Sequence, residues 1–338
     1  MAQSVKEKIS IIGAGSWGTT LALILSQKGI EVELHSVFKQ HNLQMSQDRE
    51  NKLFLKGEKF PQSLLINSSL AATLHNKVIV LAIPVKFIRG VIKKIKKRKD
   101  LIENKIFLSV AKGIESNSLK RVSQIVREEL GNVKIAVLSG PTIAKEVLCG
   151  IPTTCIIASE ERRVAQKLQN LFATPTFRIY LHQDIIGVEL GGALKNIIAL
   201  ACGISDGLGF GTNTKAGLVT RGLVEITRFG KKMGAHPATF WGISGLGDLV
   251  TTCFSPYSRN RYVGEQIGKG KSLGTILRKM SMVAEGIETV KSAYTLSKKL
   301  HVEMPITKEV YYVLYKNKFP REAVTDLMDR PLKKEKIA

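Results

Sequence analysis

The stretch Ile9-Ser10-Ile11-Ile12-Gly13-Ala14-Gly15-Ser16-Trp17-Gly18 decides the fold of the N-terminal half. A short β-branched run stops at a glycine, and a helical apolar pattern over residues 19–27 follows it. The glycines fit the pattern G-x-G-x-x-G in the strand–turn–helix context that the pattern requires. Gly13 permits the tight turn, Gly15 lets the backbone approach a pyrophosphate, and Gly18 lets the helix pack on a sheet. The stretch therefore predicts a dinucleotide-binding loop at a helix N-terminus.

Similar apolar runs, bounded by turn residues, recur along the first half of the chain. They cover residues 31–34, 78–83, 106–110, 135–138, 153–158 and 177–180. Continuous apolar runs separated by helical stretches are typical of buried parallel strands. After about Asp184 such runs vanish and helical patterns dominate. The sequence thus predicts an α/β plus all-α chain, with a Rossmann-type doubly wound sheet in a dinucleotide-binding domain, residues 1–187, and a helical substrate domain, residues 188–338.

The bulk composition is that of a globular protein of two domains, with 338 residues, of which 44% are hydrophobic and 23% charged. The four cysteines form no Cys-x-x-Cys pair and no metal-ligand spacing with the histidines, so we expect reduced thiols and no metal site. No uncharged apolar run reaches the roughly 18 residues of a membrane span. Because residues 1–8 lead straight into a strand, we expect no signal peptide and a cytoplasmic location.

The formal net charge of +23 is unusual, and one run, Lys93 to Lys99, is densely basic. One interpretation is a patch for an anionic membrane or a nucleic acid. The other is the solvated end of a helix, where cations complement the dipole. The run has no interleaved aromatic residue and the chain has no nucleic-acid motif, which favours the helix end and no dedicated nucleic-acid partner. The positive field would still attract phosphorylated substrates.

The stretch from Gly187 to Asn196 places a lysine inside a helical apolar run. Lysine is rarely buried without a partner, and a desolvated lysine exchanges protons near neutral pH. Lys195 is therefore the candidate proton-transfer residue. Gly191, Ala199 and Gly203 share its helical stripe, and we expect these small residues to leave room for the dinucleotide.

Polar residues in loops supply further candidates. Lys112 and the stretch Gly140-Pro141-Thr142 follow predicted strands, where open α/β sheets bind ligands. The glycines around Leu246 predict a flexible turn before Asp248. The run Ser258-Arg259-Asn260 offers a hydroxyl, a guanidinium and an amide at a helix start, which suits a phosphate. The alternatives, a helix cap and surface ion pairs, remain open.

The end of the second predicted strand normally carries the carboxylate that binds the adenosine ribose. Here residues 35–41 contain no Asp or Glu. Lys39, with His35 or His41, is the candidate for a 2′-phosphate, so NADP as well as NAD is expected as cofactor.

Taken in order, these motifs resemble bacterial NAD(P)-dependent glycerol-3-phosphate dehydrogenase, from about Ile9 to Asp326. Further carriers are Val283-Ala284-Glu285-Gly286 and Glu303-Met304-Pro305-Ile306. The resemblance implies interconversion of dihydroxyacetone phosphate and glycerol 3-phosphate by hydride transfer, for phospholipid synthesis. It leaves NAD versus NADP open, because Val37 and Phe38 stand where the family commonly has histidine or a basic residue.

The resemblance also implies roles for individual residues, with Lys195 as the catalytic proton acceptor or donor. The motif itself gives Gly13, Gly15 and Gly18 as cofactor contacts. The resemblance adds the cofactor contacts Ser16, Trp17, Lys112, Ala144, Arg259, Val283 and Glu285. The substrate contacts it implies are Lys112, Gly140, Thr142, Lys195, Asp248, Ser258, Arg259 and Asn260. A homodimer is a further expectation.

Two other functions stay open at this level. One is a reductase of the hydroxyisobutyrate or ketopantoate type, which the Asp248 loop and Ser258-Arg259-Asn260 disfavour. The other is a non-catalytic basic dinucleotide-binding protein that docks on membrane or RNA, supported only by the charge.

Overall fold

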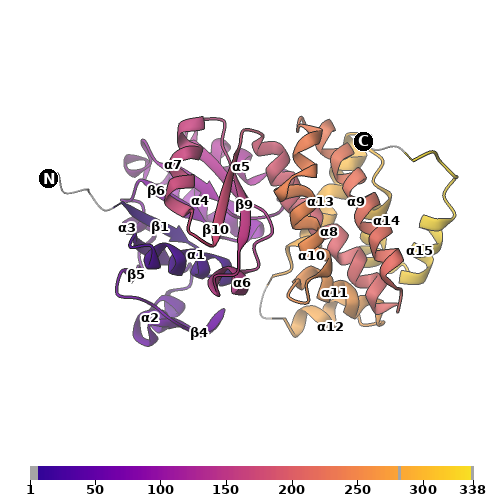
Figure 1. The fold of residues 1–338 in the computed structure, drawn as a ribbon, viewed down its shortest axis with the longest axis horizontal. Helices are drawn as coiled ribbons and strands as arrows, with labels where there is room; N and C mark the ends of the chain where they lie inside the picture. The colour runs from indigo at the N-terminus through magenta and orange to yellow at the C-terminus, as the bar shows by residue number, and fades with distance from the viewer. Residues whose placement is uncertain (1–6, 281–282, 336–338) are drawn as a thin grey trace. The chain divides into compact units, whose positions relative to one another are not determined.

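The computed structural model describes residues 7–280 and 283–335, which form two compact units (Figure 1). The sheet unit contains the chain up to Ala111, Val122–Leu138 and Thr142–Ile185. The helical unit contains Lys112–Arg121, Ser139–Pro141 and the chain from Ile186 onward. The main change of unit thus falls two residues before the predicted division at 187/188, and two loops of the N-terminal half group with the helices.

An eight-stranded sheet forms the centre of the sheet unit, in the order β10-β9-β8-β7-β6-β1-β2-β5. Its registers are parallel, with Ile9 of β1 opposite Val78 of β6 and Val32 of β2. The doubly wound sheet that the apolar runs predict is therefore confirmed. The strands are β1 Lys8–Ile12, β2 Glu31–His35, β5 Leu64–Ile66, β6 Val78–Leu81, β7 Ile106–Ser109, β8 Lys134–Ser139, β9 Thr153–Ala158 and β10 Phe177–His182.

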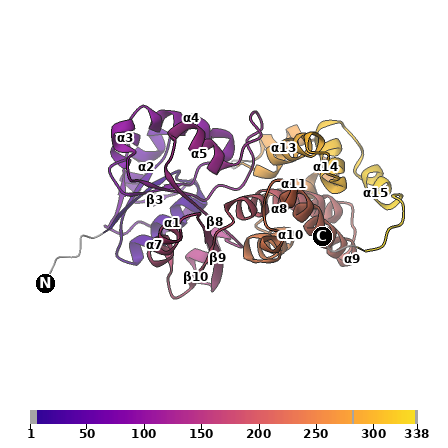
Figure 2. The same ribbon diagram turned by 90° about the horizontal axis from the view of Figure 1, so that it is seen from above.

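Helices cover both faces of this sheet. In Figure 2, α4 (Val85–Lys96) and α5 (Val122–Leu130) lie over one face, and α1 (Ser16–Gln27) and α7 (Arg162–Phe172) over the other. Each presents an apolar stripe inward, such as Ile88, Ile92 and Ile95 of α4, which are fully buried. The remaining elements are α2 Lys39–Asp48, α3 Leu70–Thr73, η1 Lys99–Leu101, α6 Ala144–Leu148 and a hairpin of β3 Glu50–Asn51 and β4 Leu55–Lys59, which the apolar pattern did not predict.

The helical unit packs around α8 (Ile185–Gly207), whose residues from Leu190 to Cys202 are almost all buried. Among the described residues α8 alone is long and apolar enough to cross a membrane, but 94% of its most apolar window is buried in the protein. It is therefore the core helix of this unit. The other helices are α9 Thr212–Lys232, η2 Pro237–Trp241, α10 Asp248–Phe254, α11 Arg259–Gly268, α12 Leu273–Arg278, α13 Glu285–Lys299, α14 Pro305–Tyr315 and α15 Pro320–Met328.

Glycines let α8 and α11 touch backbone to backbone. A Cβ on Gly203 would lie 2.0 Å from the Arg261 carbonyl oxygen, and one on Gly264 would lie 2.1 Å from the Leu200 carbonyl oxygen. On the same stripe, a Cβ on Gly191 would meet the Ser244 carbonyl oxygen at 2.6 Å. The expectation that these small residues leave room for the dinucleotide was wrong, because neighbouring backbone fills the space.

Candidate active site

Lys195 lies in the middle of α8 with its side chain inside the protein, and the residue is only 6% exposed. Its ammonium donates to Asp248 Oδ1 and, at 2.6 Å, to the hydroxyl of Thr252. Both partners come from α10. A buried cation is stable only when it is paired in this way, so α8 and α10 together fix the position of the amine.

The surroundings of Lys195 lower its pKa to about 8. Burial is the main cause, and the positive charge of Lys112 acts in the same direction, while Asp248 favours the charged form. An amine with this pKa exists in both protonation states near neutral pH, as general acid–base catalysis requires.

Lys112 binds the other oxygen of the same carboxylate. Its ammonium lies 2.7 Å from Asp248 Oδ2 and 2.8 Å from the Gly140 carbonyl oxygen. Asp248 is 1% exposed, so two lysines share one buried carboxylate. The structure thus brings together four residues that the sequence and the resemblance predicted separately, which are Lys112, Gly140, Lys195 and Asp248.

The loop that carries Lys112 is held within the helical unit. Ile114 pairs with Arg121 in an isolated β-bridge, and Arg121 forms a buried ion pair with Glu189 of α8. From α13, Ser292 donates to the Ile114 carbonyl oxygen at 3.0 Å, and Glu288 accepts from Ser116 at 2.7 Å. These contacts make Lys112 part of the same rigid frame as Lys195 and Asp248.

The segment before Asp248 is a π-helical turn, Ile243–Gly247, that runs directly into α10. The predicted flexible turn was wrong, because Ser244 and Gly245 are buried in a tight contact. A Cβ on Gly245 would lie 2.1 Å from the Phe240 carbonyl oxygen. Gly245 therefore serves close packing, and the turn leads directly into Asp248 at the start of α10.

The sequence patterns did not predict Thr252 as a residue of the site. Its hydroxyl accepts from Lys195 and lies 3.4 Å from Asp248 Oδ1. The one signal that would have found it is its place four residues after Asp248, on the same face of a helix.

The run from Ser258 to Asn260 performs different tasks in the structure. Ser258 caps α11 by accepting from the amide of Arg261, as the simpler interpretation had it. Asn260 is buried and joins three helices, since its Nδ2 donates to Asn196 Oδ1 at 2.8 Å and its Oδ1 accepts from the Gly286 amide at 3.0 Å. Arg259 is exposed, and its guanidinium donates to the carbonyl oxygen of Val283 at 2.8 Å. Val283 stands two residues before Glu285. Arg259 is the one charged residue of this run, and its side chain lies at the surface.

In the sheet unit, the glycine loop has the shape that the motif predicts. Gly13 has φ +117° and Gly18 packs so closely that a Cβ would lie 1.9 Å from the Gly13 carbonyl oxygen. Gly15 is different, because a Cβ there would meet nothing within 4 Å. No side chain caps the N-terminus of α1, where Gly15 is the cap residue. The residues present fit a dinucleotide, whose pyrophosphate would occupy the open side of Gly15.

Asn51, from the unpredicted hairpin, supports this loop. Its Nδ2 donates to the Ala14 carbonyl oxygen at 2.9 Å and to the Thr19 hydroxyl at 2.8 Å. Trp17 packs edge-on against Phe177, and the carbonyl of Ala144 lies 3.4 Å from the Thr20 hydroxyl. Thr142 and Ala144 follow β8 in this unit.

The three residues expected to bind a 2′-phosphate differ in burial, since both histidines are buried and the lysine is exposed. Burial lowers the pKa of His35, whose Nδ1 lies 2.8 Å from the Asn67 carbonyl oxygen. His41 is buried between Ser36 and Asn51. Lys39 is exposed at the start of α2, beside Phe38, which is 67% exposed. Of the three, Lys39 is therefore the one whose side chain lies at the surface.

Two family models match the chain. Residues 8–165 match the N-terminal model of NAD-dependent glycerol-3-phosphate dehydrogenase, and residues 184–325 match its C-terminal model. A curated glycerol-3-phosphate dehydrogenase [NAD(P)+] of Citrifermentans bemidjiense is 49% identical over 98% of this chain and 99% of its own. The chain belongs to the NAD-dependent glycerol-3-phosphate dehydrogenase family.

Other members of the glycerol-3-phosphate dehydrogenase family agree in sequence and in fold. A glycerol-3-phosphate dehydrogenase of Thermoanaerobacter is 47% identical over 97% of this chain and 98% of its own. The crystal structure of the Coxiella burnetii glycerol-3-phosphate dehydrogenase superposes with a TM-score of 0.92 at 37% identity, covering 96% of this chain and 99% of that one. Membership decides against the hydroxyisobutyrate- and ketopantoate-type reductases and against a non-catalytic protein.

Proposed function

We propose that Lys195 transfers the proton in this chain's reaction and that Asp248 and Lys112 hold it ready to do so. The observation that carries this proposal is the buried cluster of two lysines on one carboxylate. It leaves the amine of Lys195 with a pKa of about 8.

The reaction itself follows from the family. The chain is an NAD(P)-dependent oxidoreductase that interconverts dihydroxyacetone phosphate and glycerol 3-phosphate, and its product supplies phospholipid synthesis. NAD or NADP is its cofactor. The dinucleotide, when bound, supplies or accepts the hydride at C2 of the substrate.

The residues of the helical unit account for the remaining steps. In reduction, Lys195 gives a proton to the oxygen on C2 as the carbonyl becomes an alcohol. In oxidation, the neutral amine takes that proton back. Lys112 places a second positive charge where the oxygen carries negative charge in the transition state, which stabilises that charge in a low-dielectric site. Asp248 orients both ammonium groups.

Arg259 is the proposed phosphate-binding residue of this unit. It is exposed at the first turn of α11, where the helix amides favour an anion, and a guanidinium binds phosphate in a bidentate manner. The cofactor contacts inferred for Val283 and Glu285, and the substrate contacts inferred for Thr142, Ser258 and Asn260, stay proposals with it. So do a cytoplasmic location and a homodimer.

The direct test is oxidation of NADH and of NADPH by the purified chain with dihydroxyacetone phosphate. We expect turnover with at least one of them, and a clear loss of affinity for dihydroxyacetone phosphate in Arg259→Ala. The unphosphorylated ketone dihydroxyacetone is the matched control, because its binding has no phosphate to lose. Equal losses for both ketones would exclude Arg259 as the phosphate-binding residue.

A further inference from the structure

A basic surface of the sheet unit lies outside the candidate active site and the glycine loop. The last two turns of α4 and the residues after them carry Lys93, Lys94, Lys96, Lys97, Arg98 and Lys99, here called the lysine patch. All five lysines are exposed, while the apolar stripe of α4 between them is buried against the sheet. The helix is therefore amphipathic, and its outer side carries positive charge almost alone.

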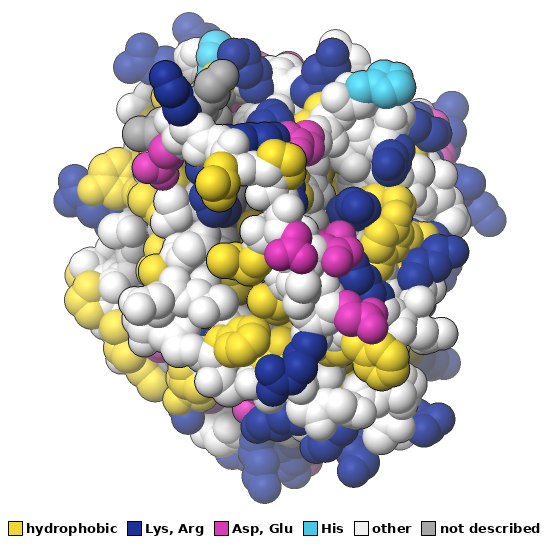
Figure 3. All heavy atoms as spheres, turned by 90° about the vertical axis from the view of Figure 1, so that its right-hand side faces the viewer, with side chains coloured by type: hydrophobic (Ala, Val, Ile, Leu, Met, Phe, Trp, Pro, Cys, Tyr) yellow, Lys and Arg dark blue, Asp and Glu magenta, His cyan; other side chains and the backbone are white. Residues whose placement is uncertain are grey.

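Few carboxylates compensate this charge. Lys96 lies 3.3 Å from Glu129, and Arg98 lies 3.2 Å from Asp100. In the part of the chain that the structure describes, Lys93, Lys94, Lys97 and Lys99 make no ion pair. On the face in Figure 3, acidic side chains lie among the lysines and arginines. The lysine patch thus concentrates positive charge, whereas the face in Figure 3 carries both signs.

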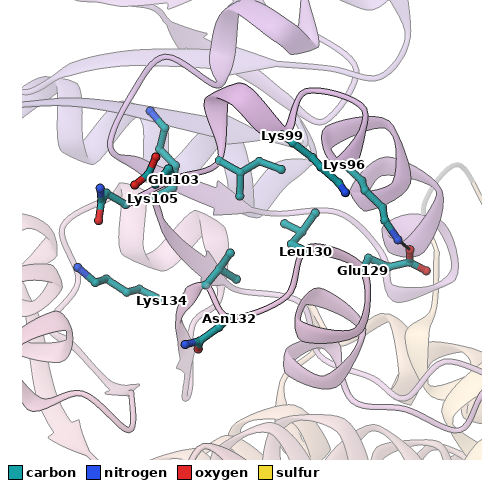
Figure 4. A pocket seen from close by; sticks show the side chains of 11 residues that line it. Lys96, Lys99, Glu103, Lys105, Glu129, Leu130, Asn132 and Lys134 are labelled. Atoms are coloured by element: carbon teal, nitrogen blue, oxygen red, sulfur yellow. Dashed lines mark hydrogen bonds and ion pairs between the residues drawn. The ribbon is translucent and has the colours of Figure 1, made fainter.

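A pocket of about 440 Å³ opens beside the patch (Figure 4). Lys96 and Lys99 line it from α4 and η1, and Lys134 lines it from the start of β8. Lys105 also lines it, although its ammonium donates to the His75 carbonyl oxygen at 2.9 Å. Glu129 is bound to Arg89 and Lys96, so Glu103 is the carboxylate of the pocket without an ion pair among the described residues. The pocket is wide enough for a phosphodiester and its charge favours one.

The patch and the pocket lie at the amino ends of the strands. Residues 102–105 lead into β7, and residues 132–134 lead into β8. The glycine loop follows β1, at the carboxyl ends of the same parallel sheet. A partner bound at the lysine patch therefore leaves the nucleotide-binding edge of this unit open.

We propose that the lysine patch docks the protein on the surface of a bilayer that contains anionic phospholipids, with a headgroup phosphate in the adjoining pocket. The argument is charge complementarity. Each lysine near an anionic bilayer strengthens binding by about fivefold, and clusters of four to eight basic residues bind such surfaces. Lysine, a hydrated point charge, suits a diffuse lipid surface, whereas nucleic-acid sites rely on arginine forks and aromatic stacking. The patch has a single arginine and no aromatic residue.

This location makes chemical sense beside the reaction, although it does not depend on it. Phospholipids carry acyl chains on the glycerol hydroxyls, so the reaction that consumes the product is an acyl transfer that yields a lipid. Docking would release glycerol 3-phosphate next to the surface where that class of reaction takes place.

The experiment is co-sedimentation of the full chain with vesicles of phosphatidylcholine alone or mixed with phosphatidylglycerol. The test variant is the triple substitution Lys93→Gln, Lys97→Gln and Lys99→Gln. The matched control is Lys231→Gln, Lys291→Gln and Lys316→Gln, which removes the same charge from exposed positions of the helical unit. Activity with dihydroxyacetone phosphate checks that both triple variants are folded.

We expect the wild type to bind the mixed vesicles at low salt and to leave them at high salt. The test variant should bind about a hundredfold more weakly, since about fivefold is lost per lysine, and the control should change less than a few fold. Equal losses in both triple variants, or no binding by the wild type, would overturn the proposal. So would release of the wild type by inorganic phosphate at constant ionic strength, which would make the pocket a site for a free phosphate, or tighter binding to RNA than to vesicles.

Discussion

The sheet unit and the helical unit prepare for a ligand in opposite ways. In the sheet unit, backbone amides are available to the ligand. Gly15 has open space where a Cβ would stand, and α1 begins without a side-chain cap. In the helical unit, buried charged side chains are placed for the chemistry, and glycines such as Gly203 and Gly245 admit neighbouring backbone. The same residue type thus indicates a ligand in one unit and a helix contact in the other. The comparison predicts that binding and chemistry can be damaged separately.

The largest effect should follow from Lys195→Met, which keeps the length of the side chain and removes its proton. We expect turnover to fall by about 10²- to 10⁴-fold, the usual contribution of a positioned general acid or base. Binding of NADH, measured by its fluorescence, should persist, because the glycine loop lies in the other unit. Lys291→Met, at an exposed position, is the control. Normal turnover in Lys195→Met would rule out the proposed role.

Gly203→Ala and Gly15→Ala test the two roles of glycine, which are close helix packing at Gly203 and open space for a ligand at Gly15. A Cβ on Gly203 must displace the backbone of α11, so we expect a loss of about 1–3 kcal/mol in the free energy of unfolding. Gly217→Ala on α9, where a Cβ meets nothing, is the control and should be neutral or stabilising. The measurement is urea unfolding, and similar stabilities for the two variants would contradict the close contact.

Gly15→Ala should leave the unfolding free energy almost unchanged and weaken NADH binding by about tenfold or more, because the methyl group would occupy the path of the pyrophosphate. Gly90→Ala on α4 is the control in the same unit, since a Cβ there also meets nothing. If Gly15→Ala bound NADH as tightly as Gly90→Ala, the loop would not be the phosphate cradle.

The pH dependence should report the lowered pKa of Lys195, which is about 8. Glycerol 3-phosphate oxidation needs the neutral amine, so kcat/KM should fall about tenfold per pH unit below that value. Reduction of dihydroxyacetone phosphate needs the ammonium and should fall in the same way above it. Profiles that are flat in both directions between about pH 6 and 9, on either side of this pKa, would exclude Lys195 as the titrating group.

The smallest effect should come from Thr252→Val. The hydroxyl of Thr252 accepts from the ammonium of Lys195 and so stabilises its charged form. Its loss should lower the pKa further and move both pH profiles to lower pH, with a change of a few fold in rate at neutral pH. Thr252→Ser keeps the hydroxyl and should restore the original profile, and a shift shared by both variants would point to packing instead.

Local patterns in the sequence were enough to predict the parallel sheet and the burial of Lys195, whose catalytic role stays a prediction. The alternation of apolar runs and the spacing from Gly13 to Gly18 depend on neighbours in the chain, and the structure confirms the fold that they predict. Thr252 and Asn51 were missed because their partners lie far away in sequence, on other elements. The π-helical turn before Asp248 was mistaken for a flexible loop because the contact of Gly245 with Phe240 cannot be derived from glycine content.

The interpretation of the basic run as a helix end is correct for part of the run. Three of its lysines do lie in the last turn of α4, where they complement the dipole. The pocket beside it could not be foreseen, since it is built from loops before β7 and β8 that are remote from α4 in sequence.

The loop Lys112–Arg121 has a consequence for any attempt to cut the protein into two. Although it belongs to the N-terminal half of the gene product, it folds with the helices, as do residues 139–141. A C-terminal fragment starting near residue 186 would contain Lys195 and Asp248 but lose Lys112 and the Arg121 partner of Glu189. Two buried carboxylates would be left undercompensated, so the halves should regain activity only when both fragments are refolded together.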